Sequence, residues 1–360
     1  MNSTIIKEIT QKALDTYLKA RQFGVMYWPD FFPLKQVLDL DYLTLIGEQE
    51  NRIIADVISY DASAPLKSRQ VVKKREGEIP KLAVKRKMKE KDMNDYLKLA
   101  RLASPGERAI LDLIYNDIDF VVEAVLGRME WIVLQAMSKT KLSFTLSNNN
   151  GIVTESAIDF LMPTANKSGA EVIWSVANKA TAKPISDIKA IVATARTAGV
   201  QLQNIWMTPA CYDIFVVCDE VINYIKAFYR MAAADVMTLE NLTLVNRALA
   251  DNRLPTINLI DTSIGIESKA GAVVWSNPYD TNYVLLTPSV QLGNFLNGPI
   301  AEEIRPPKNV IQSKAGNVLV SKFSKVDPIS EFTKGEANCF PSWGNINKCY
   351  SLKKSATSWS

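Results

Sequence analysis

The chain has 360 residues, of which 47% are hydrophobic and 22% are charged, and its formal net charge is +4. This composition excludes a disordered or collagen-like chain, and the length predicts two or three compact units, each with its own core. The sequence contains no histidine. Ser-His-Asp triads and histidine-ligated metal sites are therefore excluded, whereas carboxylate, lysine or thiol chemistry stays open.

The cysteines lie in two distant pairs, seven and ten residues apart, and match no zinc-binding pattern: Cys211 and Cys218, then Cys339 and Cys349. We expect free, mostly buried thiols in a reducing compartment. Charged residues interrupt the N-terminus before any apolar segment of secretory length, and the longest uncharged segment, 281–301, contains two prolines and two glycines. These features predict a cytosolic protein without a signal peptide or a membrane helix.

The N-terminal region combines a predicted helix with a cluster of aromatic residues. Apolar residues recur at helical spacing over residues 3–21, which predicts a short amphipathic helix. Residues 27–33 follow with four aromatic residues and two prolines and cannot continue it. Their large rings need cover, so the segment is either an extended arm docked on another surface or a loop tucked onto its own domain. The sequence leaves both open.

From Arg52 onward the pattern becomes strand-like and predicts a long hairpin or extended loop, interrupted by the breaker at 61–65. Eleven basic and four acidic residues lie between Lys67 and Asp92, a surplus of +7 (11 − 4) within 26 residues. Such a segment must lie in solvent or against an acidic surface. Because no aromatic residue lies between Asp61 and Asp95, it could contact nucleic-acid phosphates but offers no platform for stacking bases.

The clearest predicted helix covers residues 105–139 and begins with a capping box at Ser104. Its length of about 50 Å exceeds the core of a small domain, so we expect it to bridge separate packing layers. Its predicted solvent face carries Asp112, Asp119, Glu123 and Glu130. Acids at 112, 117, 119 and 123 could be imagined as a two-metal cluster, but a solvated helix face explains their spacing better.

An α/β stretch of about a hundred residues follows and suggests a domain inserted into the first one. Strands at 141–146 and 152–160 flank a turn before it. Its expected elements are a helix at 184–198, a strand at 204–207, a helix from 208 to about 228, and strands at 255–261 and 273–275. Residues 283–340 are expected to return as strands that close the sheet of the first domain.

Three strings in the second half of the chain carry a family resemblance. Residues 327–333 read DPISEFT; residues 174–175 read WS and are followed by PISDIKA at 184–190; QLGN at 291–294 precedes AEE at 301–303. In this order they resemble the closing segment, the start of the inserted domain and the late LGN region of lambda-type tailed-phage major capsid proteins, the capsid protein E family. The order of elements is also similar to that family, although residues 339–360 and the basic loop follow no family pattern.

The resemblance implies an α+β fold of the Hong-Kong-97-type phage capsid class. It would comprise an N-terminal arm (1–45), an extended loop (46–92), a peripheral domain with the long spine helix 105–139 (93–170 and 273–360), and an inserted axial α/β domain (171–272). The implied function is architectural rather than enzymatic, without catalytic residues, cofactor or metal. Copies of the chain would form pentamers and hexamers of an icosahedral shell around double-stranded DNA, contacted without sequence specificity.

Implied partners are further copies of the chain, a scaffolding protein, a portal protein and a possible decoration protein, with assembly in the host cytoplasm and no membrane. We expect the basic loop to lie across an adjacent subunit and to meet acids on its spine helix. The predicted subunit interface comprises Trp28, Phe31, Phe32, Lys67, Arg69, Lys73, Lys74, Arg75, Lys85, Arg86, Lys87, Asp112, Asp119 and Glu123. Two other functions stay open: a nucleic-acid-binding protein that uses residues 67–92, and a carboxylate-metal nuclease.

Overall fold

The structure is a computed structural model, and it forms two compact units. It describes residues 11–24, 26–47, 72–94, 106–145, 148–149, 157–231, 241–267, 271–325, 327 and 329–359. Unit 1 comprises Met1–Leu43, Glu76–Glu130 and Asn294–Ser342, and unit 2 comprises Thr44–Arg75, Trp131–Gly293 and Trp343–Ser360. The helix cap expected at Ser104, the breaker at 61–65 and most of the turn expected at 147–151 lie outside the described residues.

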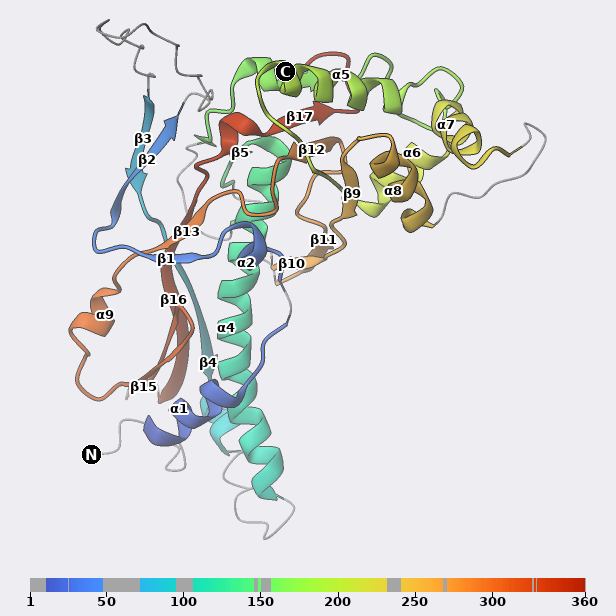
Figure 1. The fold of residues 1–360 in the computed structure, drawn as a ribbon. Coiled ribbons are helices and arrows are strands. Elements are labelled where there is room, and N and C mark those ends of the chain that lie inside the picture. Colours follow the sequence, from blue (N-terminus) through green and yellow to red (C-terminus); the bar gives the residue numbers. More distant parts are fainter. Residues whose placement is uncertain are drawn as a thin grey trace, which may run out of the picture. The chain divides into compact units, whose positions relative to one another are not determined.

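Unit 1 is built around a sheet of order β1-β13-β16-β15-β14, in which β4 also pairs with β16 (Figure 1). Its strands are β1 (Leu34–Gln36), β4 (Lys81–Met88), β13 (Asn294–Asn297), β14 (Ile311–Ala315), β15 (Val318–Lys325) and β16 (Ser330–Ser342). The long strand β16 is central, because it pairs antiparallel with β13, β15 and β4. The register of β16 on β15 and β4 determines which residues of these two strands lie beside the DPISEFT string.

The extended loop is shorter than the sequence predicts. Strands β2 (Asp41–Gly47) and β3 (Val72–Glu78) form a separate two-stranded sheet, as expected for a hairpin. Strand β4, however, pairs with β16 from Lys81 opposite Asn338 to Met88 opposite Glu331. Residues 81–88 are therefore part of the unit 1 sheet and not of a loop. The high charge density of this segment indicated a loop, but the segment is a strand whose apolar residues Leu82 and Met88 are buried.

The spine helix is confirmed as α4 (Gly106–Lys139), which has 34 residues and runs from unit 1 into unit 2. Other helices of unit 1 include α1 (Gln11–Ala20), α2 (Trp28–Phe31) and α9 (Ala301–Ile304). Strand β16 approaches α4 closely at Gly335, where an added Cβ would lie 2.7 Å from the carbonyl oxygen of Val121. Glycine is required at this point because any side chain would push the strand away from the helix.

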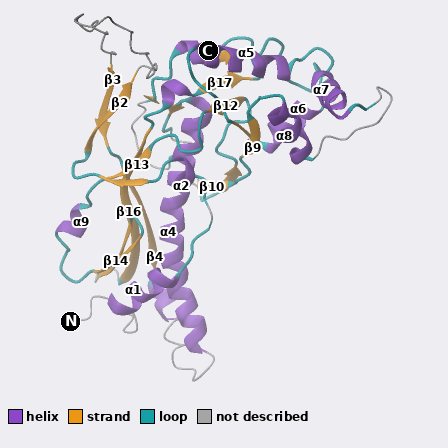
Figure 2. Cartoon of the chain, in the orientation of Figure 1, coloured by secondary structure: helices purple, strands orange, loops and turns teal. Residues whose placement is uncertain are grey.

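Unit 2 contains the α/β domain. Its sheet has the order β7-β17-β12-β8-β9. The strands are β7 (Lys167–Gly169), β8 (Asn204–Met207), β9 (Thr256–Leu259), β12 (Tyr283–Thr287) and β17 (Tyr350–Lys353). Helices of unit 2 pack with this sheet (Figure 2), namely α5 (Pro184–Thr197), α6 (Pro209–Val216), α7 (Asp219–Tyr229) and α8 (Leu242–Asp251). Apolar side chains of these helices and of β8, β9, β12 and β17 form one buried core.

Short elements complete the described part of unit 2. The expected pair of strands beside the turn is present as β5 (Lys141–Leu142) and β6 (Ile158–Asp159), which are antiparallel. Strands β10 (Ile264–Glu267) and β11 (Val273–Ser276) form an antiparallel ribbon, and 3-10 helices occur at Thr164–Asn166 and Ile346–Lys348. No helix in the described part of the chain is long and apolar enough to span a membrane.

Helix α5 and strand β8 lie where the sequence predicts them, but two other expectations for this region are wrong. The helix expected from 208 to about 228 is broken, because Cys218 is extended (φ −72°, ψ 132°) and begins α7. The apolar spacing continues through this break, so periodicity does not reveal it. Strand β12 closes the sheet of unit 2, where it pairs with β8 and β17, and not that of the first domain. The apolar sequence of a buried strand predicts that it is buried but not which sheet it joins.

All four cysteines are free and buried, as the sequence predicts. Burial raises the pKa of Cys211 and of Cys349 to about 12 and that of Cys218 to about 11. Because the thiolate is the reactive form, fewer than one of the four thiols should react with Ellman's reagent at pH 8 in the native protein, and all four should react in denaturant. Rapid reaction of a native thiol would contradict this placement.

Candidate subunit interface

The basic side chains of β4 are held by their own unit. The Arg86 guanidinium forms an ion pair with Asp117 of α4 at 3.1 Å and lies 4.2 Å from the centre of the Phe120 ring. The Lys85 and Lys87 ammonium groups lie 4.8 and 5.9 Å from the centre of the Phe332 ring of β16. These cation–π contacts and the ion pair hold β4 to the sheet and the helix. The predicted role of these three residues in reaching a neighbouring subunit therefore lacks support from their geometry.

The other basic residues of the predicted interface precede β4 in the chain. Lys67 and Arg69 lie outside the described residues. Lys73, Lys74 and Arg75 lie on strand β3, which pairs with β2 in the two-stranded sheet. The role of these residues in an interface stays a prediction.

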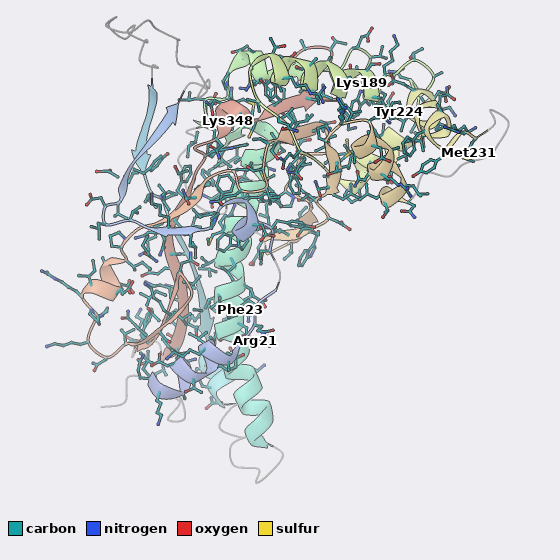
Figure 3. The ribbon with its side chains drawn as sticks, in the orientation of Figure 1. Arg21, Phe23, Lys189, Tyr224, Met231 and Lys348 are labelled. Atoms are coloured by element: carbon teal, nitrogen blue, oxygen red, sulfur yellow. The ribbon has the colours of Figure 1, made fainter. Side chains whose placement is uncertain are left out.

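The three predicted acids of the spine helix differ in their surroundings. Asp119 accepts a hydrogen bond from the Tyr17 hydroxyl at 2.8 Å and forms an ion pair with Arg21 at 2.9 Å (Arg21 is labelled in Figure 3). It therefore ties α1 and the residues after it to α4. Glu123 is exposed, whereas the side chain of Asp112 lies outside the described residues. Glu123 is thus the better placed of the described acids to meet a neighbouring subunit.

The aromatic residues of the N-terminal segment are buried in unit 1. Trp28, Phe31 and Phe32 are 6%, 1% and 0% exposed, and the Trp28 ring packs edge-on against Phe295 at 5.4 Å. Their assignment to a subunit interface is therefore wrong, since they leave almost no surface for a neighbour. The alternative, a segment tucked onto its own domain, describes the structure. Pro29 pre-sets the backbone for the short helix α2 that turns the rings inward.

Glu130 explains how this segment is fixed, and it corrects another prediction. The sequence places Glu130 on the solvent face of the spine helix, but the residue is only 1% exposed. Its carboxylate accepts hydrogen bonds from the backbone N–H groups of Tyr27 at 3.0 Å and Trp28 at 2.7 Å, at the N-terminus of α2. Burial raises the pKa of Glu130, and these two hydrogen bonds oppose the shift. The backbone N–H groups of Tyr27 and Trp28 need a hydrogen-bond acceptor, and helical periodicity does not predict that Glu130 is buried to supply it.

The EFT part of the DPISEFT string surrounds a buried lysine that sequence reasoning missed. Lys322 of β15 lies directly opposite Thr333 of β16 and diagonally opposite Glu331, so all three share one face of the sheet. The Lys322 ammonium lies 3.3 Å from Glu331 and 3.4 Å from the Thr333 hydroxyl, and Lys322 and Glu331 are each 1% exposed. Phe332, on the other face, stacks on Phe323. These contacts give the string a structural role.

A second set of charges lies further along β16. Glu336 is buried and forms ion pairs with Lys81 of β4 at 2.6 Å and with Lys334 at 2.8 Å. Lys334 also binds Glu302 of α9. Burial alone would raise the pKa of Glu336, but the hydrogen bonds and charges of Lys334 and Lys81 outweigh it and hold the pKa below its ordinary value. This cluster joins three elements of unit 1.

The lowered pKa of Glu336 predicts acid sensitivity. The ionised form is favoured by folding, so its contribution is fully present above pH 4.5 and is lost as the pH falls through the folded-state pKa. We expect Glu336→Gln to lower the free energy of unfolding at pH 7 and to flatten its decline between pH 5 and pH 3. Urea unfolding at both ends of this range measures the effect. An equally steep decline in wild type and variant would contradict it.

The WS and PISDIKA strings meet at the start of α5 in unit 2. The Trp174 indole N–H donates to the Asp187 carboxylate at 2.8 Å, and the Glu171 backbone N–H donates to the same carboxylate at 3.1 Å. Burial raises the pKa of Asp187, and both hydrogen bonds oppose that shift. Nearby, Lys189 of α5 lies 4.7 Å from the ring centre of Tyr224 of α7 (Figure 3). The string thus fixes the first helix of the domain to the preceding chain.

No group of three Cys, Asp or Glu side chains among the described residues is placed to hold a metal ion. The charged clusters described above instead join strands and helices within each unit. These clusters therefore stabilise the fold of each unit.

A family model for phage major capsid protein E matches residues 13–247, which is more than half of the chain. The chain belongs to this family. The match covers the N-terminal segment, the extended loop, the spine helix and most of the α/β domain of this capsid protein. The resemblance seen in the sequence is therefore confirmed. No curated protein matches this member of the family.

Solved structures confirm the fold of the capsid protein. One is the crystal structure of a protein assigned as the capsid protein of a prophage of E. coli CFT073, with a TM-score of 0.57, 15% sequence identity, and coverage of 96% of this chain and 99% of that chain. Another is a phage-related protein from Bordetella bronchiseptica RB50, with a TM-score of 0.51, 11% identity, and coverage of 96% and 97%. The predicted α+β capsid fold of the Hong-Kong-97 type is thus confirmed.

Proposed function

We propose that this member of the phage major capsid protein E family assembles as pentamers and hexamers into an icosahedral shell that encloses packaged double-stranded DNA. The family match over residues 13–247 carries this proposal. The fold supports it, because the similarity to a prophage capsid structure extends over 96% of the chain. The family is structural, so the chain acts through its contacts with other copies rather than through catalysis.

The basic extended loop is the proposed contact between copies. Loop residues Lys73, Lys74 and Arg75 would lie against the spine helix of an adjacent subunit, where Glu123 offers an exposed carboxylate. Each exposed pair would contribute only about 0.2 to 1 kcal/mol, but the contact recurs at every subunit boundary of a closed shell. The proposed partners outside the chain are a scaffolding protein, a portal protein, a possible decoration protein and the phosphate backbone of the genome, with assembly in the host cytoplasm.

Sedimentation velocity tests the proposal on the purified full-length chain, with and without a co-expressed scaffolding protein. We expect a small species, consistent with monomers or capsomers, together with particles of megadalton mass. A 40.1 kDa monomer as the sole species under all conditions, including high concentration, would overturn the proposal.

A further inference from the structure

The β10 and β11 ribbon of unit 2 exposes apolar side chains on both of its faces. The ribbon follows β9 (Figure 1) and pairs Ile264 with Ser276 through to Glu267 with Val273. Opposite residues of an antiparallel pair share a face, and successive residues alternate. Val273, Val274 and Trp275 are 50%, 63% and 69% exposed, although they alternate between the two faces. Within the part of the chain that the structure describes, neither face of β11 is therefore covered.

The ring of Trp275 has a flat support. Gly265 lies directly opposite Trp275, and a Cβ added there would lie 3.2 Å from the indole ring and 2.8 Å from Val273. Glycine thus lets the indole lie across the strand and present an extended apolar surface outward. Tryptophan surfaces of this kind bury about 150 to 250 Å² when a partner covers them and are frequent anchors of interfaces.

The base of the ribbon is held in place, so the exposed face is a fixed feature. The Asn277 amide donates to the Ile260 carbonyl at 2.8 Å, which joins the two ends of the ribbon. The Tyr279 backbone N–H donates to the Asn277 side chain at 2.9 Å, and the buried Tyr279 hydroxyl donates to the Trp206 carbonyl at 3.1 Å. Among the described strands, β10 and β11 pair only with each other. A two-stranded ribbon is marginally stable in water unless something packs on it.

We infer that this ribbon docks on an adjacent copy of the chain within a capsomer, with Trp275 as its anchor. The inference rests on the proposed shell assembly. The ribbon is much smaller than the surface of about 800 Å² per partner that a stable independent interface buries, so it fits a partner that other contacts already hold nearby. A ring of copies also requires two different patches on each chain. Apolar side chains are also exposed in unit 1, at Leu34, Leu38 and Leu40.

Hydroxyl-radical labelling of the wild-type chain tests the inference without any substitution. Unassembled subunits and purified shells made of this chain alone are labelled, and oxidation of Trp275 is measured by mass spectrometry. We expect at least a five-fold lower rate in shells, whereas buried Trp343 should stay unlabelled in both states. Shells in which Trp275 remains as reactive as in subunits would overturn the inference but leave the proposed function intact. Protection that appears only when another protein is bound to the shell would also overturn it.

A pair of variants gives a second test. Trp275→Glu should keep the thermal midpoint of the subunit, because the side chain is mostly exposed, and should lower the yield of shells at least ten-fold. Val176→Glu is the matched control in the same unit, since Val176 is 66% exposed and lies outside the ribbon. It should assemble like wild type. Equal yields for Trp275→Glu and wild type, or equal losses in both variants, would overturn the assignment of the ribbon.

Discussion

Glu331→Ala is expected to lower the free energy of unfolding by about 3 to 5 kcal/mol, because it leaves the buried ammonium of Lys322 without its carboxylate. The Thr333 hydroxyl also lies within reach of the Lys322 ammonium, at 3.4 Å, but it cannot neutralise the charge. Such a loss is a large fraction of the stability of a typical domain. Urea unfolding of purified subunits measures it, and a change below about 1 kcal/mol would show that the pair is not buried in solution.

A double variant separates the effect of charge from the effect of side-chain packing at the Lys322–Glu331 pair. Lys322→Met with Glu331→Leu removes both charges and keeps apolar volume, so most of the lost stability should return. The Glu331→Gln variant, which keeps a hydrogen-bond acceptor but no charge, should lie between wild type and Glu331→Ala. If the double variant were as unstable as Glu331→Ala, packing rather than charge pairing would explain the effect.

Reversal of the loop charges is expected to have the largest effect on assembly. With Lys73, Lys74 and Arg75 changed to Glu, the loop would repel the acidic spine of the adjacent subunit, so shells should be lost while the subunit stays folded. Electron microscopy and circular dichroism of the same sample measure both effects. Shells formed at the wild-type yield by this variant would refute the proposed role of the loop.

Two controls make this result specific. The charge-preserving variant, with Lys73→Arg, Lys74→Arg and Arg75→Lys, should assemble like wild type. Adding Glu123→Lys to the charge-reversed loop should restore part of the shell yield, because each copy then presents the inverse pair of charges. Rescue by Asp119→Lys is not expected, since Asp119 is bound by Tyr17 and Arg21 of its own chain. Failure of Glu123→Lys to rescue would place the acidic contact elsewhere.

The sequence predicts correctly the helices and strands that are marked by neighbouring residues, such as apolar periodicity, proline or glycine. The spine helix has a long apolar periodicity, and α5 has proline in its first turn and ends before Gly199, whose φ of +75° suits glycine. Strand β8 is a short apolar run between turns, and it lies at the predicted residues. The family resemblance added the fold, because its strings occur in the right order along the chain.

The remaining features depend on pairing between distant residues. Lys322 is buried because the register of β15 on β16 places it beside Glu331 and Thr333, and a lysine in a strand otherwise indicates a solvent-facing position. Glu130 is buried because the chain returns from Trp28 to cover it. The charge of β4 indicated a loop, whereas its pairing with β16 makes it part of the sheet. None of these partners is recognisable from local spacing.

The most direct test of the proposed function is cryo-electron microscopy of particles assembled from the wild-type chain. We predict closed icosahedral shells with rings of five and six copies, in which each subunit keeps the α4 spine and the two sheets described here. Particles without icosahedral order, or a uniform population of compact monomers at every concentration tested, would contradict it.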